Sequence, residues 1–570
     1  MFKKMVVLFT VFMVFATLSP AFPAAVKNSA GRTLPPDAAP LEYQVLRIMS
    51  QSATTLDWFI SVYKRTNDAN NYFGEPLVRL NKNFELVPAA AKSWRVSKDG
   101  LTWTFILDKN IYWTDGTPLT AEDFIFSFQL AADPKHGWDF AWFYSPIKNW
   151  DKAVRGEVPP SEIGIKQGND PYTLIITTEY PAPYLPMMML YSTPLSKKAY
   201  QKYGPYYNND PKTSVSCGPY ILEEWTKDKQ IIFRINKNYG GRVKPYLEKI
   251  IVTFGDPGTS AFKSYLAGEI DICGYSNSQI FTPADLEVIE KDPELSKQFH
   301  QGFGDFRTFY LGFDCYNPPF NNPKVRQAFA YAIDKESIVN TIIRKQGITA
   351  YGFLMPGFPG ANPDGLKNIY TYNPDMAKKL LAEAGYPNGK GFPSLDMWVR
   401  SDLASPTVVA VANAVGAMLK KNLGIDVKIT VKETKTFMDT LNAHKLQFYL
   451  VSYGMDYLDQ SNMLGIWAST GRHAWKNDRF DKLVEEASSL IDKKKRDEMF
   501  KEAEKILVED VGGIFLWHQT PGVLWKPYVK GKDLEPDKYG ITALHWPGIE
   551  GVGTTVFSIY ISKDVLKYRK

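Results

Sequence analysis

Hydrophobic and polar residues alternate most clearly in the segment 93–128. Asp99-Gly100 and Asp115-Gly116 are typical of turns and divide this segment into three parts. Four apolar residues between the two turns have the same parity and so share one face of a predicted strand: Leu101, Trp103, Phe105 and Leu107. The pattern therefore predicts a strand, a turn, a second strand, a second turn and then a helix.

N-cap residues followed by apolar stripes predict three helices. The helix starts are marked by Thr120 with Asp123, by Asn322 with Pro323, and by Asn373 with Pro374. Behind the second start, one helix face carries Val325, Ala328, Phe329 and Ala332. Gly385 ends the third helix, because glycine adopts the backbone conformation that closes a helix at little cost.

A second alternation lies between residues 425 and 431. Its apolar residues are Ile425, Val427, Ile429 and Val431, and the residues between them are polar. The stretch "SLDMWV" at 394–399 reads as a strand and 408–421 as a helix, and both precede this alternation. Strand, helix and strand in this order predict a parallel βαβ unit, so the expected fold class is α/β.

Length and charge narrow the classes of protein. With 570 residues, 44% of them hydrophobic and 22% charged, the chain is long enough for two or three domains with large cores. The formal net charge is +6, and no block of five or more like charges is present. A nucleic-acid partner is therefore not expected.

The first residues resemble a secretory signal. Lys3 and Lys4 precede an apolar run from Met5 to Leu18, which is shorter than the roughly 20 residues that span a bilayer. We predict a signal peptide over residues 1–25, with cleavage after Ala21 or Ala25. The three cysteines, Cys217, Cys273 and Cys315, lie far from this region, so the mature protein is expected to be periplasmic and not a lipoprotein. Three cysteines leave at least one unpaired, and the sequence does not choose a pair.

Motifs for common catalytic chemistry are missing from the sequence. No two of the six histidines have the spacing of a helical zinc site with a glutamate between them. "GYPNGKG" lacks the Ser or Thr that a phosphate-binding loop places after its lysine, here Lys390, and no G-x-S-x-G elbow occurs. We therefore expect no metal, no cofactor and no enzyme, although a triad assembled in space stays possible.

Several motifs occur in the order found in one protein family. The longest is "EPLVRLNKNFELVPAAAKSWRVSKDGLTWTFILDKNIYWTDGTPLTAEDFIFS", and the others are "SCGPYILEEW", "AGEIDI", "FNNPKVRQAFAYAIDKESIV" and "YNPDMAKKLLAEAGY". Together they resemble the family-5 extracellular solute-binding proteins, the peptide-binding components of ABC importers. The resemblance extends from about residue 42 to residue 510.

This resemblance implies a two-lobed periplasmic solute-binding fold, class II-like and of the large cluster-C type, with the ligand in a cleft between the lobes. The first lobe would comprise 26–80, 211–303 and 520–570, with an extra subdomain at 81–210. The second lobe would comprise 304–519. Such proteins are expected to act as monomers that close about a hinge and deliver the ligand to a membrane permease and its ATPase.

The stretch "SYGMDYLDQ", residues 452–460, contains the main candidate site. Taken alone, its two aspartates fit either an exposed turn or an anchor for a cation. In peptide-binding members of the family, an aspartate before an aromatic residue in such a turn binds the terminal ammonium of the ligand. The resemblance assigns this role to Asp456, and Asp459 is interpreted as a turn residue.

Further ligand-binding candidates follow from the same resemblance. Neighbours of the anchor are Tyr453, Gly454, Met455 and Tyr457. Glu75 in "FGEPLV" matches an acidic residue that faces the ligand, with a surface carboxylate as the alternative. Arg307 in "GDFRTFYLGF" lies at the crossing into the second lobe, where a hinge salt bridge is the alternative to ligand contact.

The ligand class stays open at this stage. Thr434 replaces a tryptophan of the general oligopeptide binders, and Leu441 and Leu450 replace expected basic residues. A peptide or peptide-like amine is the leading hypothesis. An oligosaccharide on aromatic platforms is the main alternative, followed by a nickel chelate or a small cationic metabolite. A secreted hydrolase is the third class.

Overall fold

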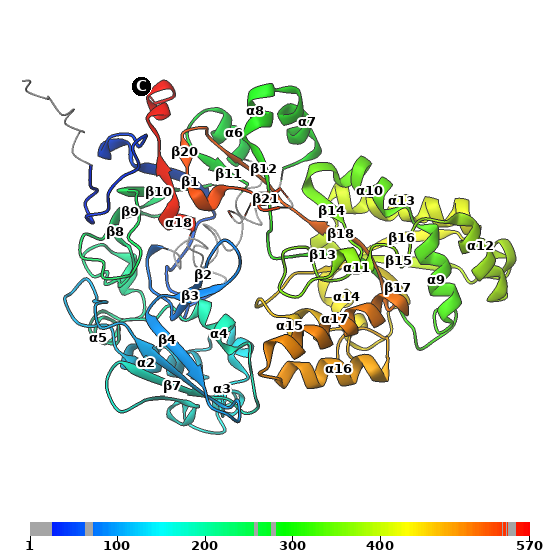
Figure 1. Cartoon of the computed structure of the whole chain (residues 1–570), viewed down its shortest axis with the longest axis horizontal. Helices are drawn as coiled ribbons and strands as arrows, with labels where there is room; N and C mark the ends of the chain where they lie inside the picture. The colour runs from blue at the N-terminus through cyan, green and yellow to red at the C-terminus, as the bar shows by residue number, and fades with distance from the viewer. Residues whose placement is uncertain are drawn as a thin grey trace, which may run out of the picture.

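The computed structural model describes residues 26–62, 72–255, 260–274, 281–538, 540–542, 544 and 555–569. The predicted signal peptide lies outside these residues. Figure 1 shows two bodies side by side, which we call the first lobe and the second lobe. The first lobe contains both ends of the described chain, and the second contains most of the chain from residue 308 to residue 519. The domain bounds given above stay a prediction.

The first lobe contains a mixed four-stranded sheet in the order β1-β10-β9-β8, in which β1 runs parallel to β10. Its strands are β1 (Val45–Ser50), β8 (Tyr220–Thr226), β9 (Gln230–Ile235) and β10 (Lys249–Phe254). Every second residue of β9 and β10 is buried, which is the pattern of strands with one face on a core. The C-terminal elements beside this sheet are β20 (Val529–Lys530), α18 (Thr555–Ser558) and β22 (Tyr560–Ile561).

A second, antiparallel sheet of the first lobe has the order β4-β5-β7-β6. Its strands are β4 (Ala91–Val96), β5 (Thr102–Leu107), β6 (Ile165–Gln167) and β7 (Thr173–Thr177), next to the hairpin β2 (Val78–Leu80) and β3 (Leu86–Pro88). The accompanying helices are α2 (Ala121–Ala131), α3 (Trp150–Val154), α4 (Leu185–Met188) and α5 (Lys197–Tyr203).

The predicted order of strand, turn, strand, turn and helix is confirmed, but Leu101 lies just before β5 and is only half-buried. Trp103, Phe105 and Leu107 are at most 6% exposed and point to one face of β5. The turn glycines both have positive φ, +74° at Gly100 and +83° at Gly116, where a side chain would be strained. Helix α2 begins after Thr120, whose N–H donates to the Asp123 carboxylate at 3.1 Å.

The second lobe is built on a six-stranded sheet in the order β14-β18-β13-β17-β15-β16. The strands are β13 (Thr308–Phe313), β14 (Gly347–Thr349), β15 (Leu395–Arg400), β16 (Val427–Lys432), β17 (Phe448–Tyr453) and β18 (Gly513–Gln519). Helices pack around this sheet: α9 (Pro323–Ala332), α10 (Lys335–Ile338), α11 (Pro363–Leu366), α12 (Pro374–Glu383), α13 (Pro406–Leu423), α14 (Thr434–Asn442), α15 (Gln460–Gly465), α16 (Asp478–Ser489) and α17 (Lys493–Glu509).

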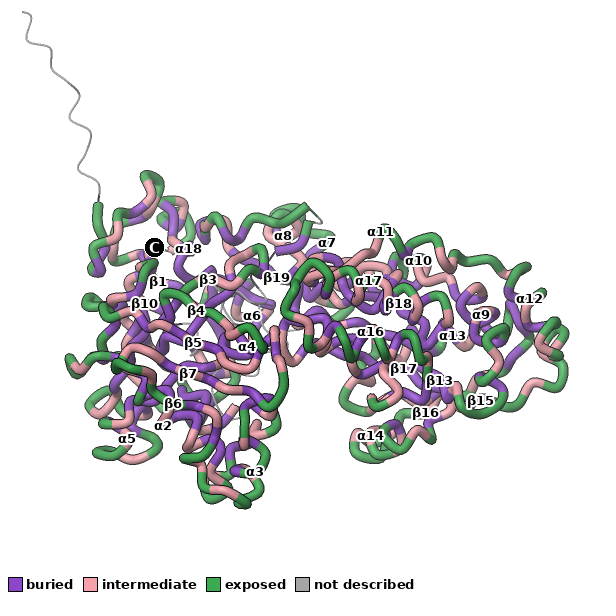
Figure 2. The backbone as a smooth tube through the Cα atoms, turned by 60° about the horizontal axis from the view of Figure 1, so that its bottom comes forward, coloured by how far each residue is buried: buried purple, intermediate pink, exposed green. Residues whose placement is uncertain are grey.

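The predicted βαβ unit and helix starts of this lobe are confirmed. Strands β15 and β16 pair in parallel on either side of α13. Asn322 and Asn373 cap α9 and α12, with their side chains accepting backbone N–H groups, and a proline occupies the first helical position of each. Figure 2 shows buried residues running through the interior of both lobes. None of the helices in the described ranges combines the length and the apolar character needed to cross a membrane.

Two neighbouring segments join the lobes. Strand β12 (Phe299–Gly302) of the first lobe continues into β13, and β18 continues into β19 (Gly522–Trp525). Because β12 pairs with β19 and β13 pairs with β18, both antiparallel, the two crossings run side by side. The sheet around them has the order β11-β19-β12-β21, with β11 (Ile272–Cys273) and β21 (Ile541–Thr542), near α6 (Ala261–Leu266), α7 (Pro283–Lys291) and α8 (Pro293–Gln298).

The cysteines do not bond to one another. Cys217 and Cys273 are buried, Cys315 is half-buried, and all three are free thiols. Burial raises the pKa of Cys315 to about 12. A thiol held protonated in this way is a poor nucleophile, so these cysteines contribute to packing.

Candidate functional site

The loop at residues 454–459 is fixed at both ends by regular structure. Before it, all six residues of β17 are buried in the sheet. After it, Asp459 caps α15 by accepting the Ser461 N–H at 2.9 Å. In the middle, the Met455 N–H donates to the Asp305 carbonyl at 3.0 Å. These constraints hold a short polar loop at the end of a buried strand, where binding residues are commonly presented.

Asp456 has its carboxylate oriented by two neutral donors. Tyr453 donates its hydroxyl to Oδ2 at 2.6 Å, and the Asn462 side-chain amide donates to the same oxygen at 3.1 Å. Asn462 also accepts the backbone N–H of Asp456 at 2.9 Å. Among the described residues, no lysine, arginine or histidine forms an ion pair with this half-buried carboxylate. The charge is therefore positioned by neutral donors and forms no ion pair with the described residues.

Arg307 supports the loop from the hinge side. Its guanidinium forms an ion pair with Asp305 at 2.5 Å and donates to the Ser452 hydroxyl at 3.0 Å. Burial is the largest single effect and lowers the pKa of Arg307. The charge and hydrogen bond of Asp305, together with the charges of Asp402 and Asp456, outweigh it, so the pKa is raised. The predicted alternative of a hinge salt bridge is thus present in the structure, while ligand contact by Arg307 stays a prediction.

Gly454 lies against this ion pair. A Cβ atom at Gly454 would collide with the Asp305 carboxylate and with the Arg307 guanidinium. The absence of a side chain lets the Asp305–Arg307 pair pack directly on the loop backbone.

Tyr457 brings the loop into contact with the first lobe. Its ring stacks on Tyr184 with centroids 5.0 Å apart, and it meets the edge of Phe143 at 6.5 Å. Burial, followed by the charge of Asp459, raises the pKa of Tyr457 well above its usual value, so the phenol stays protonated. The residue after the candidate anchor is therefore part of a contact between the lobes.

The structure does not bring Glu75 into the same cavity as the loop. Glu75 is only 2% exposed, pairs with Arg79 at 3.0 Å and accepts the Tyr239 hydroxyl at 2.8 Å. It lines a cavity of about 280 Å³ whose residues all belong to the first lobe. The alternative of a surface carboxylate is wrong, because Glu75 is buried. The ion pair with Arg79 offsets the cost of burying its charge.

A cavity of about 530 Å³ adjoins the loop in the second lobe. Its lining includes Tyr453 at the end of β17, Tyr457 of the loop and the amide that orients Asp456, but not Gly454, Met455 or Asp456. The lining residues are Asn442, Tyr453, Tyr457, Ser461, Asn462, Gly465, Ile466, Thr470, Gly471 and Arg472. Its volume is within the range of small-molecule sites. The candidate binding site therefore consists of the loop and this cavity.

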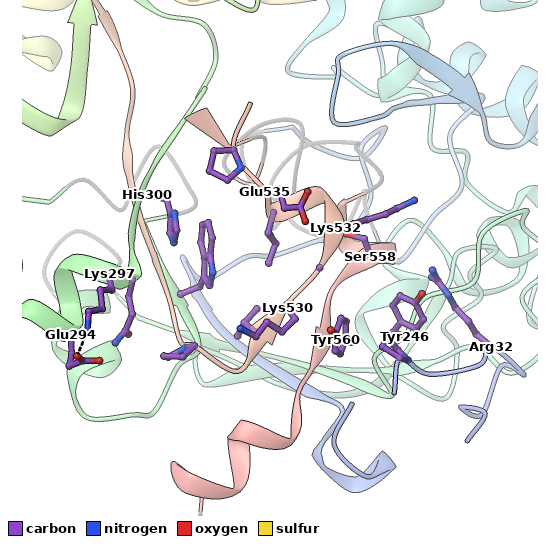
Figure 3. A pocket seen from close by; sticks show the side chains of 18 residues that line it. Arg32, Tyr246, Glu294, Lys297, His300, Lys530, Lys532, Glu535, Ser558 and Tyr560 are labelled. Atoms are coloured by element: carbon purple, nitrogen blue, oxygen red, sulfur yellow. Dashed lines mark hydrogen bonds and ion pairs between the residues drawn. The ribbon is translucent and has the colours of Figure 1, made fainter. Parts of the chain in front are cut away.

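Another cavity, of about 840 Å³, lies in the first lobe (Figure 3). It contains an ion pair between Lys297 and Glu294 at 2.7 Å and a close stack of His300 on Trp525, 3.5 Å between centroids. None of the predicted site residues lines it. The size of a cavity alone therefore does not identify the predicted site.

Metal binding finds no support in the parts of the chain that the structure describes. They contain no group of three or more His, Cys, Asp or Glu side chains arranged to hold a metal ion. Both fully buried histidines are tied to hydroxyl groups, His473 to Tyr310 and Tyr449, and His518 to Thr308. Burial lowers the pKa of His518 to about 3, so this imidazole is neutral.

Comparison with known proteins gives the family. Residues 85–475 match the bacterial extracellular solute-binding proteins, family 5 Middle, which is more than half of the chain. The chain belongs to this family. The family-5 protein described here is 29% identical over 459 residues to the periplasmic oligopeptide-binding protein OppA of Salmonella typhimurium, covering 78% of this chain and 81% of OppA.

Solved structures confirm the two-lobed fold and indicate the conformation of this family-5 protein. It matches the unliganded open form of the murein tripeptide-binding protein MppA with a TM-score of 0.81, 28% identity and coverage of 93% and 99% of the two chains. Against another structure of MppA, from Escherichia coli, the TM-score is 0.64 at 27% identity, with coverage of 92% and 100%. The arrangement of the lobes is thus nearer to that open form.

Sequence reasoning located the loop of this family-5 protein but missed the residues that support it. Asp459 was interpreted as a turn residue, and it does cap α15, but it also forms a buried ion pair with Arg496 of α17. Asn462 and Arg472 were missed as well. The capping pattern of Asp459 with the following polar residues could have indicated α15, but no local rule places Asn462 against Asp456, which lies outside this helix.

Proposed function

We propose that this family-5 solute-binding protein captures a peptide or a peptide-like amine and delivers it to the permease of an ABC transporter with its ATPase. Asp456 binds the ammonium of the ligand, with Tyr453, Gly454, Met455 and Tyr457 as its neighbours in the site. The observation that carries this proposal is the Asp456 carboxylate, which is oriented by two donors and has no counter-ion among the described residues.

The energetics favour a cationic ligand at this position. When the lobes close, water around Asp456 is displaced, and a desolvated carboxylate is costly unless a charged or hydrogen-bonded partner replaces the water. An ammonium group supplies both the charge and the N–H donors, and Oδ1 of Asp456 has room to accept because it makes no hydrogen bond within the described part of the protein. The names of the relatives, an oligopeptide-binding and a murein tripeptide-binding protein, support the same ligand class.

The wider role follows the same proposal. The protein acts in the periplasm as a monomer without a lipid anchor. Its signal peptide, residues 1–25, is cleaved from the mature chain. The ligand is held between a first lobe of 26–80, 211–303 and 520–570, with its subdomain at 81–210, and a second lobe of 304–519. The output is binding and transport without turnover of the ligand.

The proposal is tested by calorimetry with Asp456→Asn. This variant keeps the shape of the side chain and removes its charge, so a free-amine peptide should bind more weakly by roughly 30-fold or more, which corresponds to about 2–5 kcal/mol. N-acetylated peptide should bind the wild type poorly and should not distinguish it from the variant. Asp439→Asn, on the exposed face of α14 in the same lobe, is the matched control and should leave affinity unchanged.

Two results would overturn the proposal. Equal affinity of the wild type and Asp456→Asn for the free-amine peptide would show that Asp456 does not bind the ligand ammonium. If an oligosaccharide, but no peptide, stabilises the wild type in a thermal-shift screen, the transported ligand is a sugar. Such a screen is sensitive enough, because a ligand at 100 times its Kd adds about 2.7 kcal/mol of stability.

A further inference from the structure

We propose that Arg472 is a second anchor of this site, which binds a carboxylate of the ligand close to the ammonium that Asp456 binds. The inference rests on the function proposed above and narrows its ligand class. The preferred ligands are amines that carry an acidic group within about one residue, either the terminal carboxylate of a dipeptide or an acidic side chain near the amino end of a longer peptide.

Arg472 lies beside the cavity near the loop, and its guanidinium forms no ion pair with the described residues. Within the described residues, Arg307 pairs with Asp305, Arg400 pairs with Asp402, and Arg496 pairs with Asp459, whereas Arg472 pairs with no carboxylate. Its side chain lies over the ring of Tyr453, with the guanidinium carbon 4.8 Å from the ring centre. A half-buried guanidinium beside an aromatic ring retains its donors for an incoming anion.

The backbone around Arg472 is held in place. Its N–H donates to the Ile466 carbonyl at 3.2 Å, and the Gly471 N–H donates to the Ala468 carbonyl at 2.7 Å. His444 contacts the Gly471 carbonyl through Nε2 at 3.0 Å. A Cβ atom at Gly471 would collide with the Ile466 backbone, so this close turn requires glycine. The arginine side chain therefore extends from a turn whose backbone is held by the protein itself.

Tyr453 connects the two charges. Its hydroxyl donates to Asp456 at 2.6 Å, and the face of the same ring contacts the Arg472 guanidinium. One tyrosine side chain thus contacts a negative group at its hydroxyl and a positive group over its ring. We propose that the two ends of a short zwitterion bind these two groups.

The cavity beside the loop is lined by the second anchor and by both donors that orient the first, although Asp456 itself is not among its lining residues. Arg472, Tyr453 and Asn462 all line its volume of about 530 Å³, and Asn462 is one of the donors that orient Asp456. The other polar side chains of its lining are Asn442, Tyr457, Ser461 and Thr470. Arginine is suited to a carboxylate because its planar fork donates two parallel hydrogen bonds. A ligand with both charges would therefore satisfy the two anchors at once.

The experiment compares matched ligands by calorimetry on the wild type, Arg472→Gln and Arg472→Lys. The ligands are alanyl-alanine, its C-terminal amide, and glutamyl-alanine amide, so that the carboxylate comes from the main chain, is absent, or comes from a side chain. The wild type should bind at least one acid-bearing ligand roughly 10- to 100-fold more tightly than the neutral amide, in line with a hydrogen bond to a charged group. The acid that gives this preference identifies the source of the carboxylate.

The variants decide the role of Arg472. Arg472→Gln should abolish the tighter binding of the acid-bearing ligand and leave the affinity for the neutral amide within about 2-fold. Arg472→Lys should retain part of the preference for the acid-bearing ligand. Arg479→Gln, on the exposed face of α16, is the control that changes overall charge equally. If Arg472→Gln weakens acidic and neutral ligands alike, or if the wild type shows no preference, the second anchor is wrong. If no free-amine ligand binds the wild type, the proposed function fails as well.

Discussion

Glu504 allows a sharp test of burial and ionisation in the second lobe. This residue of α17 is fully buried, and its Oε1 accepts the Leu354 N–H at 2.7 Å. Oε2 has no hydrogen-bond partner among the described residues. Burial raises the pKa of Glu504 to about 7, against an ordinary 4.5, and the backbone donors of Leu354 and Phe353 offset only part of this effect.

The sign of the pH dependence follows from the raised pKa. Between pH 4.5 and about 7 the folded protein keeps a proton on Glu504 that the unfolded chain has released. The free energy of unfolding therefore falls as the pH rises through this range and levels off above it. The loss expected from the difference in pKa is about 3 kcal/mol, at about 1.4 kcal/mol per pH unit.

Glu504→Gln removes this loss, because glutamine cannot ionise. We expect the free energy of unfolding of the variant, minus that of the wild type, to rise by about 2–3 kcal/mol between pH 5 and pH 8.5. The measurement is urea denaturation followed by tryptophan fluorescence at several pH values. Glu498→Gln, on the exposed side of the same helix, is the matched control and should show a nearly constant difference. A constant difference for Glu504→Gln too would refute the argument that burial keeps this carboxyl protonated.

Three further predictions concern the loop and the lobes. Asp459→Ala leaves Arg496 without its buried partner and removes the cap of α15, so urea denaturation should show a loss of about 3–5 kcal/mol. Gly454→Ala displaces the Asp305–Arg307 pair and should weaken peptide binding by roughly 10-fold or more at unchanged helix content, measured by calorimetry and circular dichroism; unchanged affinity would show that the pair does not support the site. A bound peptide should reduce the radius of gyration in small-angle scattering, and an unchanged radius would contradict a site between the lobes.

Local patterns in the sequence predicted much of the fold. The parity of Trp103 and Phe105 fixes which face of β5 is buried, and the Asn-Pro pairs before α9 and α12 fix where these helices begin, because both effects act within a few residues. The sheet orders were not predicted. They depend on pairings between distant segments, such as β13 between β17 and β18, and no local pattern encodes these.

The same division holds for the candidate site. The loop around Asp456 could be located because its residues are contiguous and resemble a known family. The burial of Glu75 could not be predicted, because its carboxylate is covered by Tyr239, which is distant in the chain. Similarly, Arg472 becomes a candidate only when Tyr453 is seen to contact both charges, and such a contact exists only in three dimensions.

The two side-by-side crossings between the lobes have a consequence for how the molecule can be used. Adjacent, hydrogen-bonded strands resist independent twisting, so we expect the second lobe to rotate about a single axis relative to the first. Gly304 and Phe306, with φ of +59° and +53°, lie within the first crossing, where a small backbone change would rotate the whole lobe. A single inter-lobe distance then defines the conformation, and one pair of fluorescent labels, one on each lobe, is enough to convert ligand occupancy into an optical signal.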